Sequence, residues 1–156
     1  MKSERSWWRS PWLSIRAQIG LGAIFAAAAV PKIFDPPAFA HMIYNYRLLP
    51  GSAVNAAALV LPWIEIWVGA ALILGFWKRT AAWISGAMLL LFVGALTVNL
   101  VRGNPVNCGC FDLHAKDRPK AELLADMRWT IVRDAAILLL VAQVLSVNRK
   151  ERRIGP

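Results

Sequence analysis

The two cysteines of the chain, Cys108 and Cys110, are its most reactive pair of residues and are separated by one glycine. Closing a ring across a single residue needs unusual backbone angles, which Gly109 adopts most easily. Such a bridge is expected to be strained, exposed and readily reduced. A stabilising disulfide normally joins distant segments, because closing a tiny loop removes little chain entropy. The pair therefore favours thiol–disulfide exchange, with Asn107 and Phe111 as supporting neighbours.

Two other interpretations of this segment stay open. Cys108, Cys110 and His114 place two soft ligands and an imidazole within seven residues. With Asp112 as a fourth ligand, this set suits copper or zinc. The bridge can also be chemically inert and serve only to shape its loop.

Glu65 is the second candidate, because it is the only charged residue in the apolar stretch from about residue 53 to 77. A carboxylate at such depth is costly and usually faces protein or a water-filled cavity. Its candidate partners are Lys32 and Arg133, and we predict an ion pair with Arg133. The two residues would differ in depth by roughly 12 Å if the second span begins at residue 53. The difference shrinks if that span begins nearer Leu59, and the long arginine side chain covers several ångström of it. Glu65 can handle protons, contact a quinone, or simply lock the helices together.

The composition shows what kind of scaffold must position these residues. Of the 156 residues, 58% are hydrophobic and 17% are charged, and the mean hydropathy is +0.47. These values exclude a water-soluble enzyme with a large polar surface, and the apolar content excludes disorder. The net charge is +9, and the charged residues flank long apolar runs instead of forming a basic stripe between aromatic residues. This distribution is typical of a membrane protein and argues against nucleic acid as a partner.

We predict one all-α membrane domain over residues 1–156, a four-helix bundle in the lipid bilayer. Apolar segments at about 12–31, 53–77, 80–101 and 129–147 are long enough to cross a hydrocarbon core of about 30 Å. The cysteine pair lies in the loop at 102–128. The alanine run 26–29 also matches the end of a cleavable signal peptide, but Trp7, Trp8 and Trp12 favour a helix that is retained.

Short amphipathic helices are expected in both longer loops. Asp35 is a plausible N-cap for a helix with apolar residues at helical spacing. A second helix, capped by Asp117, would carry Leu123, Leu124 and Met127 on one face. Six glycines are expected to allow close helix packing: Gly20, Gly22, Gly69, Gly75, Gly86 and Gly94.

The positive charges predict the orientation. Ten Lys and Arg residues lie in the two terminal segments and the short connection at 78–79, against seven in the two longer loops. By the positive-inside rule, both termini are cytoplasmic and the cysteine loop is periplasmic. We therefore expect a multi-pass protein of the bacterial inner membrane.

Several short motifs occur in order along the chain. They are Lys32-Ile33-Phe34-Asp35, Phe39, Tyr46-Arg47-Leu48-Leu49-Pro50, Leu61-Pro62 with Glu65, Asn99-Leu100 with Gly103, and Cys108-Gly109-Cys110-Phe111. Together they resemble the methylamine utilisation protein MauE family, a branch of the DoxX-like membrane proteins, over roughly residues 12–147. Two positions depart from the family's pattern: Asp112 stands where glycine is expected, and Asp134 follows Arg133 where asparagine is expected.

The resemblance implies a four-helix membrane bundle associated with disulfide chemistry. It also implies a thioredoxin-like periplasmic partner and, in methylamine-using bacteria, maturation of the disulfide-rich small subunit of methylamine dehydrogenase. No tightly bound cofactor is expected. With a single cysteine pair, the chain must exchange electrons with a membrane carrier such as quinone or with a second protein.

Two functions from other classes are alternatives to this thiol–disulfide oxidoreductase component. The chain can be a membrane anchor or chaperone for a periplasmic redox protein, or a transporter that uses Glu65 and a central cavity. Replacing both cysteines by serine distinguishes the redox function from these two alternatives, because only the redox function needs the thiols.

Overall fold

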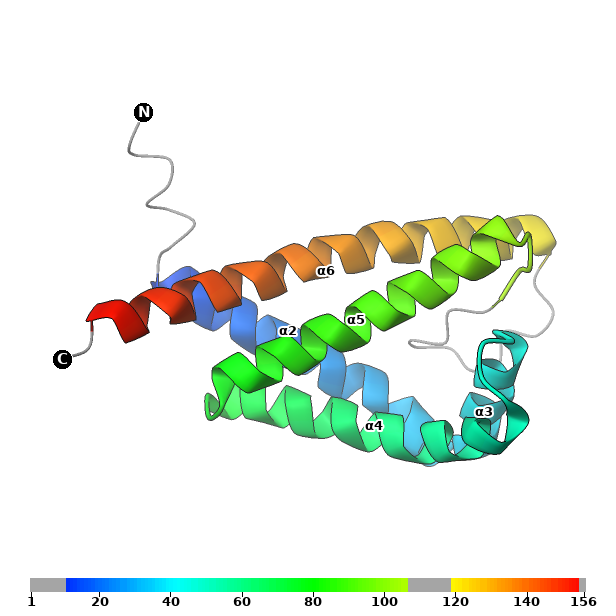
Figure 1. Cartoon of the computed structure of the whole chain (residues 1–156), viewed down its shortest axis with the longest axis horizontal. Coiled ribbons are helices and arrows are strands. Elements are labelled where there is room, and N and C mark those ends of the chain that lie inside the picture. The colour runs from blue at the N-terminus through cyan, green and yellow to red at the C-terminus, as the bar shows by residue number, and fades with distance from the viewer. Residues whose placement is uncertain (1–10, 107–118, 155–156) are drawn as a thin grey trace.

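Four long helices run up and down in the computed structural model, which describes residues 11–106 and 119–154, with side chains at 12–106 and 119–146 (Figure 1). They are α2 (Pro11–Phe34), α4 (Gly51–Leu74), α5 (Lys78–Val101) and α6 (Lys120–Ile154). Each contains a stretch that is long and apolar enough to cross a membrane. The predicted fold class, an all-α protein with four membrane-spanning helices, is confirmed.

The bounds of the first three long helices differ from the predicted spans by at most three residues. The end of α4 has a local cause. Gly75 follows with a left-handed φ of 78° and donates its backbone N–H to Ala71 O at 3.0 Å. This is a common way to end a helix, because glycine adopts that conformation at little cost. The turn leads directly into α5.

The last helix begins earlier than predicted. α6 starts at Lys120, nine residues before the expected start at 129, so the helix predicted around Leu123–Met127 is its first part. No glycine or proline interrupts residues 120–147. One buried face also continues through the predicted boundary at alternating spacings of three and four: Met127, Thr130, Asp134, Ile137, Val141 and Val144. The Asp117 cap lies outside the described residues.

The predicted helix after Asp35 is confirmed as α3 (Pro36–Asn45), which lies across one end of the bundle (Figure 1). Asp35 Oδ1 accepts a hydrogen bond from the backbone N–H of Ala38 at 3.0 Å, as expected of an N-cap. We call this end, which also holds the ends of α2 and α5 and the starts of α4 and α6, the α3 end. Apolar residues of α3 are buried there, so the helix closes the bundle.

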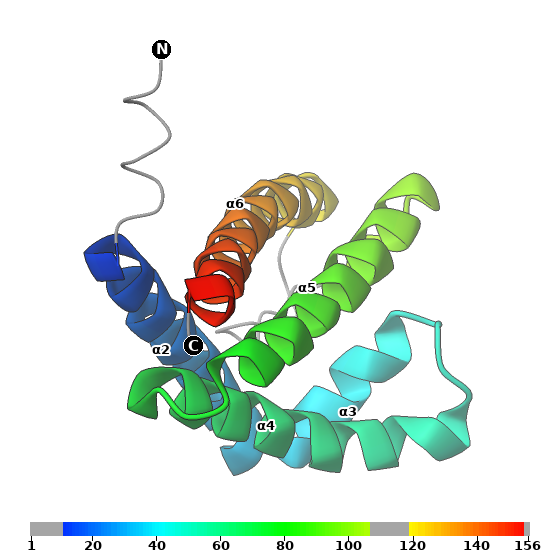
Figure 2. The same ribbon diagram turned by 60° about the vertical axis from the view of Figure 1, so that its left-hand side comes forward.

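The four long helices form a ring in which α2 contacts α4, α4 contacts α5, α5 contacts α6 and α6 contacts α2. Figure 2 shows α6 between α2 and α5, with α4 on the other side. Among the described residues, the backbones of α4 and α6 do not come close to each other, so these two helices are diagonal partners. One cluster of buried apolar residues, including Leu21, Leu72 and Val144, fills the ring away from the α3 end. A second cluster, including Phe39, Leu96 and Met127, lies at the α3 end.

Helices α2 and α4 make the most extensive contact, and their backbones touch at a pair of glycines. A Cβ atom on Gly22 would lie 2.7 Å from Gly69 O, and one on Gly69 would lie 2.8 Å from Gly22 O. The packing role predicted for these two glycines is confirmed. For Gly20 and Gly94 it is wrong, because a Cβ there would meet no atom within 4 Å.

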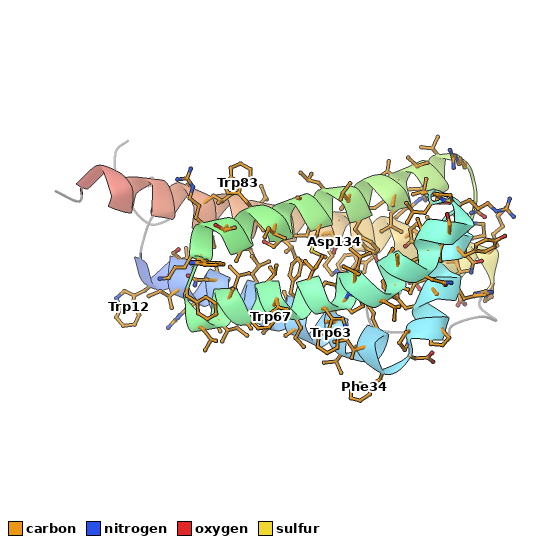
Figure 3. The ribbon with its side chains drawn as sticks, turned by 60° about the horizontal axis from the view of Figure 1, so that its bottom comes forward. Trp12, Phe34, Trp63, Trp67, Trp83 and Asp134 are labelled. Atoms are coloured by element: carbon orange, nitrogen blue, oxygen red, sulfur yellow. The ribbon has the colours of Figure 1, made fainter. Side chains whose placement is uncertain are left out.

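The outer surface of the bundle is apolar and rich in aromatic side chains. Trp12, Phe34, Trp63, Trp67 and Trp83 are all exposed and point away from the bundle (Figure 3). A water-soluble protein rarely exposes so much apolar surface, whereas lipid covers such a surface in a membrane. By contrast, Asp134 points inward between the helices (Figure 3).

Candidate functional site

The cysteine motif falls in the part of the chain that the structure does not describe. Cys108, Gly109, Cys110 and their neighbours Asn107 and Phe111 lie there, as does the alternative metal ligand His114. No group of three or more metal-binding side chains occurs within residues 11–106 and 119–154. The last described residue before this segment is Val106, which is buried among Phe39, Met42 and Tyr46 at the α3 end.

Glu65 forms an ion pair with Lys32. The Lys32 Nζ atom donates to both carboxylate oxygens, at 2.7 Å and 2.8 Å. Only 9% of the lysine side chain and 13% of the glutamate side chain are exposed. The ammonium group also lies 5.2 Å from the centre of the Phe39 ring, within range of a cation–π interaction. The pair therefore joins α2 to α4 and contacts α3.

The glycine crossing explains how these two residues reach each other. Lys32 lies ten residues beyond Gly22, or about 15 Å, and Glu65 lies four residues before Gly69, or about 6 Å. Helical side chains lean toward the N-terminus of their own helix. Because α2 and α4 run in opposite directions, the two side chains lean toward each other along the bundle and close this gap.

The predicted ion pair between Glu65 and Arg133 is wrong. Arg133 instead binds the next residue, with its Nε and Nη2 atoms 3.0 Å and 2.9 Å from Asp134 Oδ1. The Asp134 side chain is only 3% exposed. The reason lies in the ring of helices: α4 and α6 are diagonal, so Glu65 and Arg133 face a common cavity, whereas α2 touches α4 directly.

Two asparagines that had no assigned role fix α3 in place. Asn99 is fully buried, and its Nδ2 atom donates to Tyr46 O at 3.2 Å and to Ala95 O at 3.0 Å. Asn104 Nδ2 donates to Asn99 Oδ1 at 3.0 Å and to Asn45 O at 3.3 Å. The end of α3 is therefore tied to the end of α5. An asparagine within an apolar span was the signal available in the sequence, since such a residue needs a buried partner.

A cavity of about 410 Å³ lies in the half of the bundle nearer the α3 end. Residues of all five helices line it, and most of them are apolar. Among the described residues, four charged side chains belong to its wall: Lys32, Glu65, Arg133 and Asp134. Sequence reasoning singled out the first three, and the structure brings them together around one space. Such a space can hold a small molecule of mainly apolar character.

These features define a class: a multi-pass, four-helix membrane protein with paired charges around an internal cavity. Comparison with known protein families then identifies the family within this class. The family described as "Methylamine utilisation protein MauE" matches residues 10–147 of the chain. The chain belongs to this family, which confirms the resemblance drawn from its motifs.

Individual relatives carry the same description. The chain is 36% identical over 101 residues to the methylamine utilization protein MauE of Methylophilus methylotrophus, covering 64% of this chain and 53% of that protein. It is 36% identical over 123 residues to the MauE of Paracoccus versutus, covering 78% and 62%. The MauE of Paracoccus denitrificans is 38% identical over 95 residues, covering 60% and 51%. The matches thus span about half to three-fifths of these relatives. No solved structure matches the chain.

Proposed function

We propose that this protein is a membrane component of thiol–disulfide exchange, in which Cys108 and Cys110 react with a thioredoxin-like partner. One observation carries the proposal: the only two cysteines of the chain flank a single glycine. Val106, two residues before Cys108, is buried with Phe39, Met42 and Tyr46, and these three residues also line the cavity. Membership of the MauE family supports a role in methylamine utilisation.

The chemistry is an exchange of sulfur bonds. A thiolate of the partner attacks one sulfur of the Cys108–Cys110 bridge, the bridge breaks, and a mixed disulfide forms. The released cysteine thiolate is the leaving group. A second thiolate of the partner then resolves the mixed disulfide, so the partner leaves oxidised and this pair leaves reduced. An oxidised partner of this kind can supply disulfides to a protein that needs them, such as the small subunit of methylamine dehydrogenase.

Trapping the mixed disulfide tests this proposal. Thiol–disulfide exchange is reversible, so a single cysteine left by a serine substitution can attack the disulfide of an oxidised partner and form the same mixed disulfide. It lacks the neighbouring thiolate that would complete the exchange in this direction. We expect either Cys108→Ser or Cys110→Ser, expressed in a methylamine-using host, to yield an adduct that a reductant removes. Mass spectrometry would identify the attached protein.

The double variant Cys108→Ser, Cys110→Ser is the matched control and should yield no adduct. Methylamine-dependent growth and the disulfide content of the dehydrogenase small subunit should fall in this variant. Normal maturation without either cysteine would overturn the redox function and favour a membrane anchor or chaperone for a periplasmic redox protein. Copper or zinc bound to the wild-type chain and lost on substitution would favour the metal site instead.

We also propose that the protein spans the bacterial inner membrane with both ends of the chain in the cytoplasm and the cysteine segment in the periplasm. The two terminal charge clusters and the basic turn at 78–79 support this orientation. Reporter fusions at Pro156 and within residues 112–116 should report opposite sides of the membrane. A mature chain that begins near Pro31 would contradict it, because α2 would then be lost.

A further inference from the structure

The cavity at the α3 end has the dimensions of a binding site. Its volume of about 410 Å³ falls within the range of about 300–1,000 Å³ that is common for small-molecule pockets. Apolar side chains from different helices form most of its wall, among them Phe25, Met42, Phe92 and Ile137. A molecule held here must therefore be largely apolar.

The charges in the wall indicate that the occupant is neutral. Lys32 is paired with Glu65, and Arg133 is paired with Asp134, so the four groups sum to no net charge. An ionic ligand would leave its own charge without a counter-charge in a region of low dielectric constant, at a high free-energy cost. A neutral molecule with polar atoms avoids this cost.

The Lys32–Glu65 pair can both donate and accept a hydrogen bond at the cavity wall. The lysine ammonium has three N–H donors, of which two are directed to Glu65 oxygens. The remaining N–H can bind a carbonyl oxygen, and the Glu65 carboxylate can accept from a hydroxyl group. The pair therefore suits a ring oxygen that is a carbonyl in one oxidation state and a hydroxyl in the other.

The cavity also reaches the outer surface of the bundle. Ile24, Leu48, Leu49 and Leu91 belong to its wall, and the same side chains are exposed on the surface that faces lipid. A molecule dissolved in the membrane can thus enter sideways and leave an apolar tail outside.

We propose that this cavity binds the head group of a lipid-soluble quinone, with Lys32 and Glu65 at one ring oxygen. The proposal rests on the proposed function, because the quinone would accept the electrons of the cysteine pair. In that step the two cysteine S–H bonds break and one S–S bond forms. Two electrons and two protons pass to the quinone, whose two carbonyl groups become the hydroxyl groups of a quinol.

Binding is tested on the full chain with both cysteines replaced by serine, so that the result does not depend on thiol chemistry. Decylubiquinone, a short-tailed quinone, is titrated into the purified protein in detergent, and its Kd is measured by calorimetry. Ala28 on α2 lines the cavity, and the neighbouring Ala27 is exposed outside it. Ala28→Phe should fill the site and raise Kd by about tenfold or more. Ala27→Phe should leave Kd unchanged.

A second cavity variant and a control ligand complete the binding test. If Ala28→Phe does not fold, Ala95→Leu fills the same cavity from α5. Decylbenzene, which has the tail without the quinone oxygens, should bind at least about tenfold more weakly than decylubiquinone. Equal Kd values for the two compounds, or for Ala28→Phe and Ala27→Phe, would overturn the proposal and leave a site for lipid chains only.

Electron transfer is measured separately on the reduced wild-type chain without oxygen. One quinol should form for each disulfide, and Ala28→Phe should slow this reaction at least about tenfold. Binding without quinol formation would overturn the electron-accepting step. Trapping of the thioredoxin-like partner needs no quinone, so the two proposals fail independently.

Discussion

Replacing Lys32 by methionine is expected to destabilise the bundle by about 3–5 kcal/mol. Methionine has a similar length but cannot pair with Glu65, whose carboxylate is only 13% exposed. Removing one partner of a buried ion pair leaves a charge without compensation, which costs about this much. The free energy of unfolding, measured by SDS titration in mixed micelles, gives the loss directly.

The double variant Lys32→Met, Glu65→Met should recover most of this loss, because it removes both charges together. Lys120→Met is the matched control: this lysine is exposed at the start of α6, and its loss should change the free energy by less than about 0.5 kcal/mol. If the losses at Lys32 and Glu65 simply add, the two residues do not stabilise each other in the membrane.

Gly22→Ala should destabilise the protein by about 1–3 kcal/mol, because the new methyl group would lie 2.7 Å from the backbone of α4 at Gly69. A backbone cannot move aside as a side chain can, so α2 and α4 must separate. Gly20→Ala is the matched control two residues earlier on the same helix, where a Cβ would meet nothing within 4 Å.

The control should be neutral or stabilising by up to about 1 kcal/mol, because alanine favours a helix over glycine. The same SDS titration measures both variants. Since the crossing also sets the spacing of Lys32 and Glu65, Gly22→Ala should weaken their coupling in a double-mutant cycle. Equal effects of the two alanine substitutions would show that α2 and α4 do not touch at this point.

The sequence predicts the four spans well because each requirement is local. About twenty apolar residues with charges at their ends are sufficient to recognise a span, and Asp35 followed by two prolines is sufficient to recognise the start of α3. The start of α6 was harder to predict. Arg128 and Trp129 resemble the edge of a membrane segment, but neither residue breaks a helix, so the helix extends back to Lys120.

The partner of Glu65 depends on tertiary structure and could not be read from spacing. Depth along each helix left Arg133 and Lys32 both available, and only the ring order of the helices selects Lys32. In the same way, glycine content alone does not separate Gly22 from Gly20, because the contact depends on which face of α2 meets α4. Burial of Glu65 followed from its sequence context, whereas its partner required the arrangement of α2, α4 and α6.

The paired charges around the cavity have an electrical consequence. A membrane potential does work of about 2.3 kcal/mol per elementary charge for each 100 mV that the charge crosses. Lys32 with Glu65, and Arg133 with Asp134, carry equal and opposite charges at close range, so a rigid shift of either pair moves no net charge through the field. A neutral molecule in the cavity adds no net charge either. Voltage across the membrane would therefore do work on these two pairs and on a neutral occupant only when a proton or an electron enters or leaves the cavity.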